Sequence, residues 1–227
     1  MRVSIIIPTL DDNPALVNLL QQISNWPNQA YEVLVVDAKY DEACSTICER
    51  YAATHISFNK NRGAQQRHGA EKASGDVLWF LHADATPSPD ALLEIQTIIG
   101  SGAMGGFFRF AFNTETTSWT QKLISAFTNW RSKHFIAYGD QGIFVDAKFY
   151  ATCGGHSDQA LFEEVALIRA LRKSGKLKPS DLSIRVSTRR WEQDGYWKRT
   201  VQNRFLALAY LFGVQADTLA SWYKPKR

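Results

Sequence analysis

The sequence predicts an α/β fold in which a mainly parallel central sheet is flanked by helices. Short, nearly continuous apolar runs alternate along the chain with segments of helical period, which is typical of parallel strands buried on both faces. The 227 residues are enough to bury a core on each side of such a sheet. Apolar residues make up 45% and charged residues 21% of the chain, a composition that excludes disordered and fibrous proteins.

The first strand is expected at the start of the chain, where the run Val3-Ser4-Ile5-Ile6-Ile7 is stopped by Pro8. A helix is expected to follow, with Asn13 as its cap and Pro14 at its first helical position. Proline suits that position because its missing N–H would have no helical partner there. Apolar residues then recur with helical period as far as Ile23, so the first strand is followed by an amphipathic helix.

The same alternation continues along the rest of the chain, although the second half is less regular. Most of the expected strands are short apolar runs, and 107–112, after a glycine-rich connection, has an alternating character. Further strands are expected at 32–36, 55–58, 77–81, 107–112, 142–145 and 184–187, and helices at 41–53, 64–73, 89–99, 119–131, 162–173 and 197–211.

Charge is distributed unevenly along the chain. The net charge of +4 is too small to require a nucleic-acid partner, and we expect none. Residues 1–168 carry a net −6, however, and residues 169–227 a net +10. A basic final quarter indicates an anion nearby, either a phosphate ligand or a membrane surface. Because no repeat or linker is found, we treat 1–227 as one domain whose parts are 1–100, 101–195 and a basic helical extension at 196–227.

Cysteine usage and hydropathy predict a cytoplasmic protein. Three cysteines do not make a disulfide framework, and neither a signal peptide nor a run of 18 apolar residues is found. Peripheral contact with the inner face of the membrane stays open, because basic residues flank the apolar segment 205–214; a helix packed on the sheet would look similar. The flanking residues are Lys198, Arg199, Arg204, Lys224, Lys226 and Arg227.

Acidic side chains follow two of the expected strands. Asp37 ends the second strand, and His82-Ala83-Asp84 follows the fourth. Parallel sheets bind ligands at the carboxyl ends of their strands, so both aspartates are candidate site residues, together with the loop 8–12. His82 and Asp84 are alternate residues that could hold Mn²⁺ or Mg²⁺. Either aspartate could instead cap a turn or a helix.

Charged side chains also mark the starts of two expected helices. Arg62 and Arg67 lie at a helix start, where guanidinium and free N–H groups suit a diphosphate, although a solvated helix face would also explain them. Glu163 and Glu164 open the helix expected at 162–173. One of them could serve as a general base, although the helix dipole alone also favours acidic residues in a first turn.

Two further clusters could contact a sugar or a phosphate. Asp140 and Gln141 stand between two glycines, which allow close backbone approach, but a hairpin turn would explain the same segment. Arg189, Arg190 and Trp191 follow the last strand. Two guanidinium groups beside an indole suit a diphosphate or a sugar ring, although the same residues could stack on one another at the surface.

Together these segments resemble family 2 glycosyltransferases of the GT-A fold, in particular a small bacterial subgroup, over roughly residues 2–223. The start of the chain, Ser4 to Asp12, is similar to the family pattern V-I-I-P-T-L-N-E, and Glu32 to Asp37 resembles E-V-I-V-V-D. Gly75 to Asp84 is similar to the subgroup pattern G-D-x-L-x-F-L-H-A-D. Two further segments, 138–145 and 189–192, also match the subgroup.

The resemblance implies transfer of a sugar, with inversion, from a nucleotide diphosphate sugar to a hydroxyl acceptor that is a saccharide or a lipid-linked molecule. It assigns roles to the candidates above. Pro8, Thr9, Leu10, Asp12, Asp37, Arg62 and Arg67 would bind the nucleotide, Asp84 and His82 a divalent metal (Mn²⁺ or Mg²⁺), and Asp140, Gln141, Arg189, Arg190 and Trp191 the donor or acceptor. Glu164, beside Glu163, would be the catalytic base.

The chain departs from the family pattern at several positions, and two other functions stay open. Ala38-Lys39-Tyr40 replaces a turn rich in glycine and serine, and Glu164 stands where the family has aspartate. One alternative is therefore a catalytically idle protein that binds a sugar nucleotide or a membrane surface. The other is a nucleotidyltransferase, but these enzymes carry a glycine-rich, basic loop after the first strand, whereas the loop 8–12 is acidic.

Overall fold

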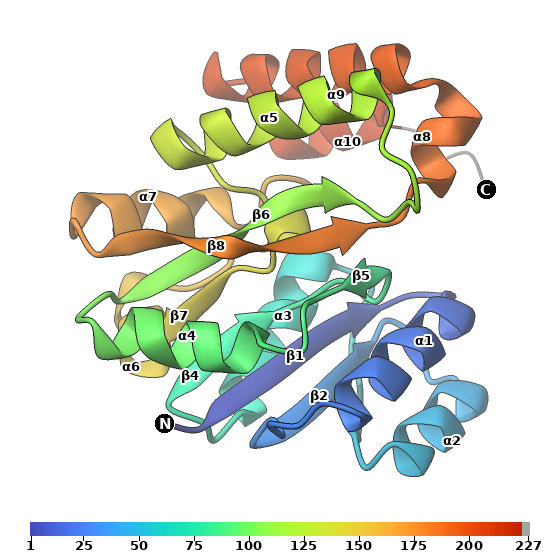
Figure 1. Ribbon diagram of the computed structural model, residues 1–227, viewed down its shortest axis with the longest axis vertical. Coiled ribbons are helices and arrows are strands. Elements are labelled where there is room, and N and C mark those ends of the chain that lie inside the picture. The colour runs from blue at the N-terminus through green and yellow to red at the C-terminus, as the bar shows by residue number, and fades with distance from the viewer. Residues whose placement is uncertain (224–227) are drawn as a thin grey trace.

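The computed structural model, which describes residues 1–223, contains one curled eight-stranded sheet with helices on both faces (Figure 1). The strand order is β3-β2-β1-β4-β7-β6-β8-β5. The strands are β1 (Val3–Thr9), β2 (Glu32–Asp37), β3 (Thr54–Ser57), β4 (Val77–Phe80), β5 (Ala85–Thr86), β6 (Gly105–Phe112), β7 (Phe144–Asp146) and β8 (Leu177–Val186).

The two halves of the sheet differ in strand direction. In the first half, β3, β2, β1 and β4 are all parallel, as the apolar runs predicted. In the second half, β7 is antiparallel to both β4 and β6, β8 is parallel to β6, and β5 is antiparallel to β8. The α/β prediction is therefore confirmed, while the second half of the sheet is mixed.

The helices largely follow the predicted order. Those that the sequence analysis did not predict are short, with seven residues or fewer. The helices are α1 (Asn13–Ser24), α2 (Glu42–Arg50), α3 (Arg62–Lys72), α4 (Ala91–Gly100), α5 (Trp119–His134), α6 (Ala147–Cys153), α7 (Val165–Lys173), α8 (Arg189–Asp194), α9 (Tyr196–Leu211) and α10 (Ala216–Trp222). The helices that were not predicted are thus α6, α8 and α10.

Two predicted helix starts are wrong. Asn13 does not cap α1; Asp12 precedes the helix without a capping side-chain bond, and the Asn13 amide instead donates to Asp41 at 2.8 Å. Glu163 and Glu164 do not lie in a first helical turn either, because α7 begins at Val165. Glu164 is the N-cap residue of α7, but its side chain makes no capping bond, so the pair does not cap the helix.

The core lies on both faces of the sheet because side chains of a strand point alternately to either side. Ile5 and Ile7 of β1 pack with residues of α1, α2 and α4 on one face, whereas Ile6 belongs to the cluster with α7 on the other. All three isoleucines are fully buried. Burying each such side chain stabilises the fold by about 1.5–3 kcal/mol.

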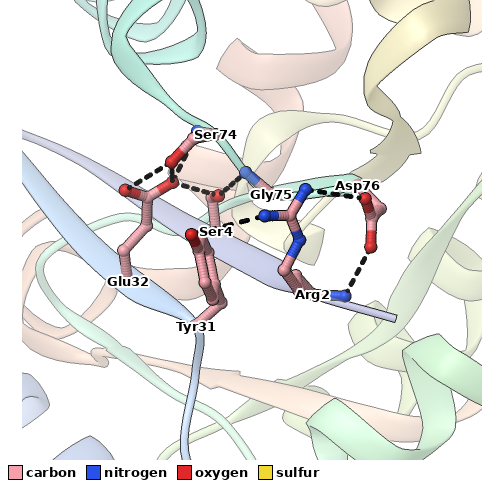
Figure 2. Close-up of polar contacts among 7 residues, drawn as sticks. All are labelled: Arg2, Ser4, Tyr31, Glu32, Ser74, Gly75 and Asp76. Atoms are coloured by element: carbon pink, nitrogen blue, oxygen red, sulfur yellow. Dashed lines mark hydrogen bonds and ion pairs between the residues drawn. The ribbon is translucent and has the colours of Figure 1, made fainter.

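Polar contacts fix the amino-terminal edge of the parallel strands (Figure 2). The Ser4 hydroxyl donates to Glu32 at 2.6 Å and accepts from the N–H of Gly75 at 2.9 Å, which joins β1, β2 and the start of β4. Arg2 pairs with Asp76 at 3.2 Å. These bonds hold the register from one edge and leave the carboxyl ends of the same strands free for a site.

A separate helical layer covers the second half of the sheet. Helices α5, α9 and α10 lie together at the end of the molecule beyond β6 and β8 (Figure 1). Phe110 and Phe112 of β6 pack against Ile124 of α5 and against Trp191 and Tyr196. This layer faces the carboxyl ends of the parallel strands and forms the second wall of the site. Within residues 1–223, no helix is long and apolar enough to cross a bilayer.

Candidate active site

The carboxyl ends of three parallel strands meet at one edge of the sheet. Thr9 of β1 is in register with Asp37 of β2, and β4 leads directly into His82 and Asp84. The loop after β1 is tied to the loop after β2 by the ion pair between Lys39 and Asp11, at 2.7 Å. The predicted nucleotide loop and the predicted metal residues therefore occupy neighbouring positions.

Asp37 is held firmly at this edge. Its buried carboxylate accepts the backbone N–H groups of Lys39 (3.2 Å) and Asp41 (3.1 Å) and lies 3.4 Å from Nε2 of His55. Asp37, Cys44 and His55 bring one ligand atom each within 4.8 Å of one another. The two backbone bonds that the carboxylate accepts shape the loop on this side of the site.

A cavity of about 250 Å³ brings together many of the predicted site residues. It lies between the end of β4, the segment 138–140, the start of α7, and the helices α5, α8 and α9. The predicted residues that line it are Arg62, His82, Asp84, Asp140, Glu164, Arg190 and Trp191.

Other predicted residues lie outside this cavity. The side chain of Gln141 is fully buried, accepts from Ser132 and donates to the carbonyl of Phe108 at 3.0 Å. Its amide thus joins α5 to β6 through contacts within the fold. Arg67 pairs with the exposed Asp158 at 2.6 Å.

The loop after β1 approaches the site from another side. Arg189 lies beside Asp84 in a groove next to α1, and it pairs with Asp12 at 3.3 Å. Pro8 and Thr9 are buried and Leu10 is half-buried. Among the described residues lining the 250 Å³ cavity, none comes from the segment 8–12.

Glu164 is the buried acid of the cavity. One carboxylate oxygen accepts the N–H of Gly139 at 3.1 Å, while the other has no hydrogen-bond partner among residues 1–223. Burial and the neighbouring Glu163 raise the pKa of Glu164 to about 8. A carboxyl group with a free oxygen and a pKa near neutrality is suited to accept a proton during a reaction.

Glu163 has the opposite character. Its buried carboxylate pairs with the guanidinium of Arg62. Burial alone would favour the neutral form, but Arg62 outweighs it and lowers the pKa of Glu163. Two adjacent carboxyl groups with pKa values moved in opposite directions are typical of catalytic sites, where one acid is kept charged and the other titrates near neutral pH.

The chain before α7 has the conformation that this arrangement needs. Phe162 adopts a left-handed conformation (φ 62°) and lines the cavity beside Glu164. Such a conformation is costly for a bulky residue and is concentrated at functional sites. Gly63 at the start of α3 lets this segment approach closely, since a Cβ there would lie 2.0 Å from the carbonyl oxygen of Ser157 and 2.8 Å from Cβ of Glu163.

Replacing Gly63 with alanine is therefore expected to lower the free energy of unfolding by about 1–3 kcal/mol, because the segment 157–163 must move away from α3. The same movement would separate Arg62 from Glu163 and reduce activity. Thermal unfolding of Gly63→Ala and Gly100→Ala checks this, since a Cβ at Gly100 meets nothing within 4 Å. Equal melting temperatures for the two variants would contradict the packing argument.

His82 and Asp84 fit a divalent cation. Burial and the charge of Arg62 lower the pKa of His82 to about 4, so its imidazole is neutral near pH 7. Its buried Nε2 has no hydrogen-bond partner among the described residues and lies close to Gly139, where a Cβ would approach it to 3.0 Å. A neutral imidazole nitrogen and a carboxylate form a donor set that Mn²⁺ accepts well and Mg²⁺ accepts through the carboxylate.

The sequence analysis missed the residues that α5 and α9 contribute. These helices come from distant parts of the chain and are held together by the bond from Gln121 to the Tyr196 hydroxyl, at 2.7 Å. The sequence signal that could have indicated these residues is that neither helix contains an acidic residue, so their arginines have no acidic neighbour on the same helix. The missed residues that line the cavity include Arg131, Tyr138, Arg199, Asn203 and Arg204.

Residues 4–165 match the family model described as Glycosyl transferase family 2. Among curated proteins, the chain is 27% identical to the glycosyltransferase AglE of Haloferax volcanii over 147 residues, covering 60% of this chain and 48% of the relative. It is 29% identical to the dolichol-phosphate mannosyltransferase of Pyrococcus furiosus over 135 residues, covering 55% and 38%. This chain therefore spans half or less of the length of these relatives.

Solved structures share the fold at low sequence identity. Glucosyl-3-phosphoglycerate synthase from Mycobacterium tuberculosis, in complex with Mn²⁺, uridine diphosphate and glucosyl-3-phosphoglycerate, gives a TM-score of 0.63 at 14% identity, covering 89% of this chain and 79% of that one. Residues 1–349 of Staphylococcus aureus TarS, in complex with UDP-GlcNAc, give a TM-score of 0.64 at 12% identity, covering 82% and 58%. These likenesses confirm the GT-A fold, and the family model covers more than half of the chain. The chain therefore belongs to glycosyl transferase family 2.

Proposed function

We propose that this chain transfers a sugar from a nucleotide diphosphate sugar to an acceptor hydroxyl, with inversion at the anomeric carbon and with a divalent metal bound. The observation that carries this proposal is the shared cavity of Asp84 and Glu164. A candidate metal ligand and a buried carboxyl group with a free oxygen face the same space in a chain of family 2. The structural neighbours with bound uridine diphosphate, Mn²⁺ or UDP-GlcNAc support the donor class.

Each part of the site has a role in this proposal. Asp37 and the loop 8–12 bind the nucleoside. Asp84 and His82 hold the metal, which neutralises charge that develops on the leaving nucleotide. Arg190 lies beside Asp84 in the cavity wall and contacts the diphosphate. In this proposal the donor lies along the carboxyl edge of the sheet, with its sugar toward Glu164.

The transfer is a single displacement. Glu164 takes the proton of the acceptor hydroxyl, and the acceptor oxygen forms the new bond to the anomeric carbon. The bond from that carbon to the diphosphate oxygen breaks, and its electron pair leaves with the nucleoside diphosphate. Attack from the face opposite the leaving group inverts the configuration. The charged pair of Glu163 and Arg62 positions the segment that carries Glu164.

A thermal-shift panel tests the donor site. Nucleoside diphosphates and their sugars are added with and without Mn²⁺ or Mg²⁺, because a ligand that binds the folded state raises the melting temperature by mass action. At 100 times the dissociation constant, the stabilisation is about 2.7 kcal/mol. We expect a metal-dependent shift with one nucleotide. If no nucleotide at millimolar concentration shifts the melting temperature, the proposal of a donor site is contradicted.

Two alternatives make different predictions. A nucleotidyltransferase needs a basic, glycine-rich loop after β1, whereas Asp11 and Asp12 make this loop acidic and Lys39 already pairs with Asp11. A catalytically idle protein would bind the sugar nucleotide but not consume it. Measuring nucleoside diphosphate release separates this second alternative from the transferase.

We further propose that the helical layer touches an anionic membrane surface. Exposed apolar side chains recur every three or four residues on α5 and on α9. These side chains form one apolar stripe along each helix. Neither helix has an acidic residue, so the charge of this face complements anionic lipid. The stripes are Trp119, Leu123, Phe127 and Trp130 on α5, and Trp197, Val201, Phe205 and Leu208 on α9.

In this proposal, only some of the basic residues that flank the apolar segment are placed to meet lipid. Arg199 is buried and pairs with Asp194 at 2.6 Å, and Arg204 lies over the ring of Phe127 and lines the cavity. Arg199 is therefore not free to meet a lipid surface, whereas Lys198 is exposed beside the stripe of α9. Of the other basic residues predicted to flank the apolar segment, Lys224, Lys226 and Arg227 lie outside the described residues.

Replacing Trp197 and Phe205 together with serine is expected to weaken binding to phosphatidylglycerol vesicles by at least about tenfold, because each large apolar side chain contributes about 1.5–3 kcal/mol when buried. Leu93 of α4, 54% exposed, provides a matched control as Leu93→Ser. Co-sedimentation at low and high salt measures the effect. Wild-type protein that stays wholly in the supernatant at low salt would rule out the contact.

A further inference from the structure

The cavity contains more positive charge than its carboxylates neutralise. Five arginines line it. Arg62 and Arg199 form ion pairs with carboxylates, but Arg131, Arg190 and Arg204 form none with any residue of the described chain, 1–223. If Arg190 serves the donor diphosphate, two guanidinium groups still lack an anion.

Arg131 and Arg204 belong to opposite helices of the same wall. Arg131 projects from α5, with its guanidinium carbon 4.4 Å from the ring centre of Tyr138, and Arg204 projects from α9, 3.6 Å from the ring centre of Phe127. The two are close enough that, together with burial, Arg131 lowers the pKa of Arg204. The aromatic rings fix both side chains in place and leave their N–H groups available.

This placement is unfavourable without a ligand. Nε of Arg131 is buried and has no hydrogen-bond partner among residues 1–223. Two neighbouring positive charges repel one another, and a buried donor without an acceptor costs free energy. Arg131 interacts electrostatically with Asp140, but the two form no ion pair, and burial raises the pKa of Asp140 despite the charge of Arg131. An anion with two or more acceptor oxygens between the two guanidinium groups would satisfy both.

We propose that the acceptor carries an anionic group, a phosphate or a carboxylate, which Arg131 and Arg204 bind at the α5–α9 wall of the cavity. The inference rests on the proposed transfer and names the class of its acceptor. The anion is a binding group and not the attacking atom. A phosphate oxygen is already deprotonated near pH 7 and needs no base, whereas Glu164 lines the same cavity and suits a hydroxyl.

Two kinds of molecule present this chemistry. A soluble phosphorylated metabolite would enter the cavity from water. A lipid with a phosphate headgroup would enter from the exposed apolar stripes, since Phe127, on which Arg204 lies, belongs to the stripe of α5. The two sources share the anion and differ in the chain attached to it, so one experiment can separate them.

The experiment uses protein saturated with Mg²⁺ and the nucleoside diphosphate that the donor panel identifies, so that the donor site is filled. It is then titrated calorimetrically with inorganic phosphate, with glycerol 3-phosphate, and with dihexanoyl phosphatidic acid below its micelle concentration. We expect phosphate to bind, and Arg131→Gln and Arg204→Gln each to weaken it at least about tenfold, as expected for loss of a charge-assisted pair. Arg169→Gln, which removes an exposed arginine of α7, is expected to bind phosphate as wild type does.

The outcomes separate cleanly. Tighter binding of the acylated phosphate identifies a lipid acceptor, and tighter binding of glycerol 3-phosphate identifies a soluble one; both support the inference. No phosphate binding, or equal binding by wild type and both cavity variants, overturns it, provided that each variant keeps its donor-dependent thermal shift. Loss of that shift in the wild type would instead contradict the proposed function and leave this inference without its basis.

Discussion

Replacing Glu164 with glutamine is expected to lower sugar transfer by about 10²- to 10⁴-fold while leaving donor binding intact, because the amide cannot accept the acceptor proton. The side chain keeps its size and can still accept the N–H of Gly139 through its carbonyl oxygen. The cavity should therefore keep its shape. Steady-state rates and the donor-dependent thermal shift measure the two effects separately.

The pH dependence of the wild type follows from the same group. A base must be deprotonated to act, and burial beside Glu163 raises the pKa of Glu164 to about 8 in the free protein. The value of kcat/KM should thus fall as the pH is lowered through this range, rather than near pH 4 to 5 as for an ordinary glutamate. The low-pH limb should vanish in Glu164→Gln.

Thermal stability supplies an independent check. The pKa of Glu164 is higher in the folded than in the unfolded chain, so its contribution is fully present at low pH and is lost as the pH rises through about 8. Glu164→Gln should therefore melt at a higher temperature than the wild type above pH 8, and the difference should shrink toward pH 5.

Glu163→Gln is the matched control, because it is expected to lower the melting temperature where Glu164→Gln raises it. It leaves Arg62 without its buried partner and should lower stability by on the order of 1 kcal/mol, a modest value because Arg62 is 41% exposed to water. Equal destabilisation by both variants would mean that Glu164 is an ordinary structural acid. Full activity in Glu164→Gln would exclude it as the base.

Replacing Asp84 with asparagine is expected to abolish the metal-dependent part of donor binding and to reduce transfer by at least about 10²-fold. The carboxylate is the hard, charged ligand of the proposed pair, and His82 alone is a poor ligand for Mg²⁺. Titration of Mn²⁺ into protein with bound nucleoside diphosphate, followed by electron paramagnetic resonance, measures the loss directly.

Asp90→Asn provides the control for Asp84→Asn. Asp90 is an exposed aspartate at the start of α4 whose side chain makes no capping bond, so its removal should change neither Mn²⁺ affinity nor transfer. Unchanged Mn²⁺ affinity in Asp84→Asn would show that the metal binds elsewhere or that the site does not use one.

Strand ends were predictable because local sequence determines them. The apolar runs before Asp37 and Asp84 form parallel strands, and the topology of such strands brings their carboxyl ends to one edge. That rule was enough to place both aspartates at the same edge of the sheet. The resemblance to the family then singled out Glu164, a buried residue that lines the cavity; the sequence alone also allowed the helix dipole as the reason for this acid.

The opposite wall of the cavity was not predictable in this way. Arg131 and Arg204 are far apart in sequence and meet only because α5 and α9 pack across the same half of the sheet. The left-handed conformation of Phe162 likewise depends on packing around it, since a bulky residue has no local preference for it. The environment of Gln141 was not predictable for a related reason: its polar side chain bonds inside the fold, between α5 and β6.

Release of nucleoside diphosphate from the donor sugar, measured with and without divalent metal, tests the central claim most directly. The account predicts metal-dependent release by the wild type, stimulated by an anionic hydroxyl acceptor and lost in both Asp84→Asn and Glu164→Gln. Donor binding without any release, in the presence of phosphorylated soluble and lipid acceptors, would contradict it and identify a protein that binds sugar nucleotides without transferring their sugar.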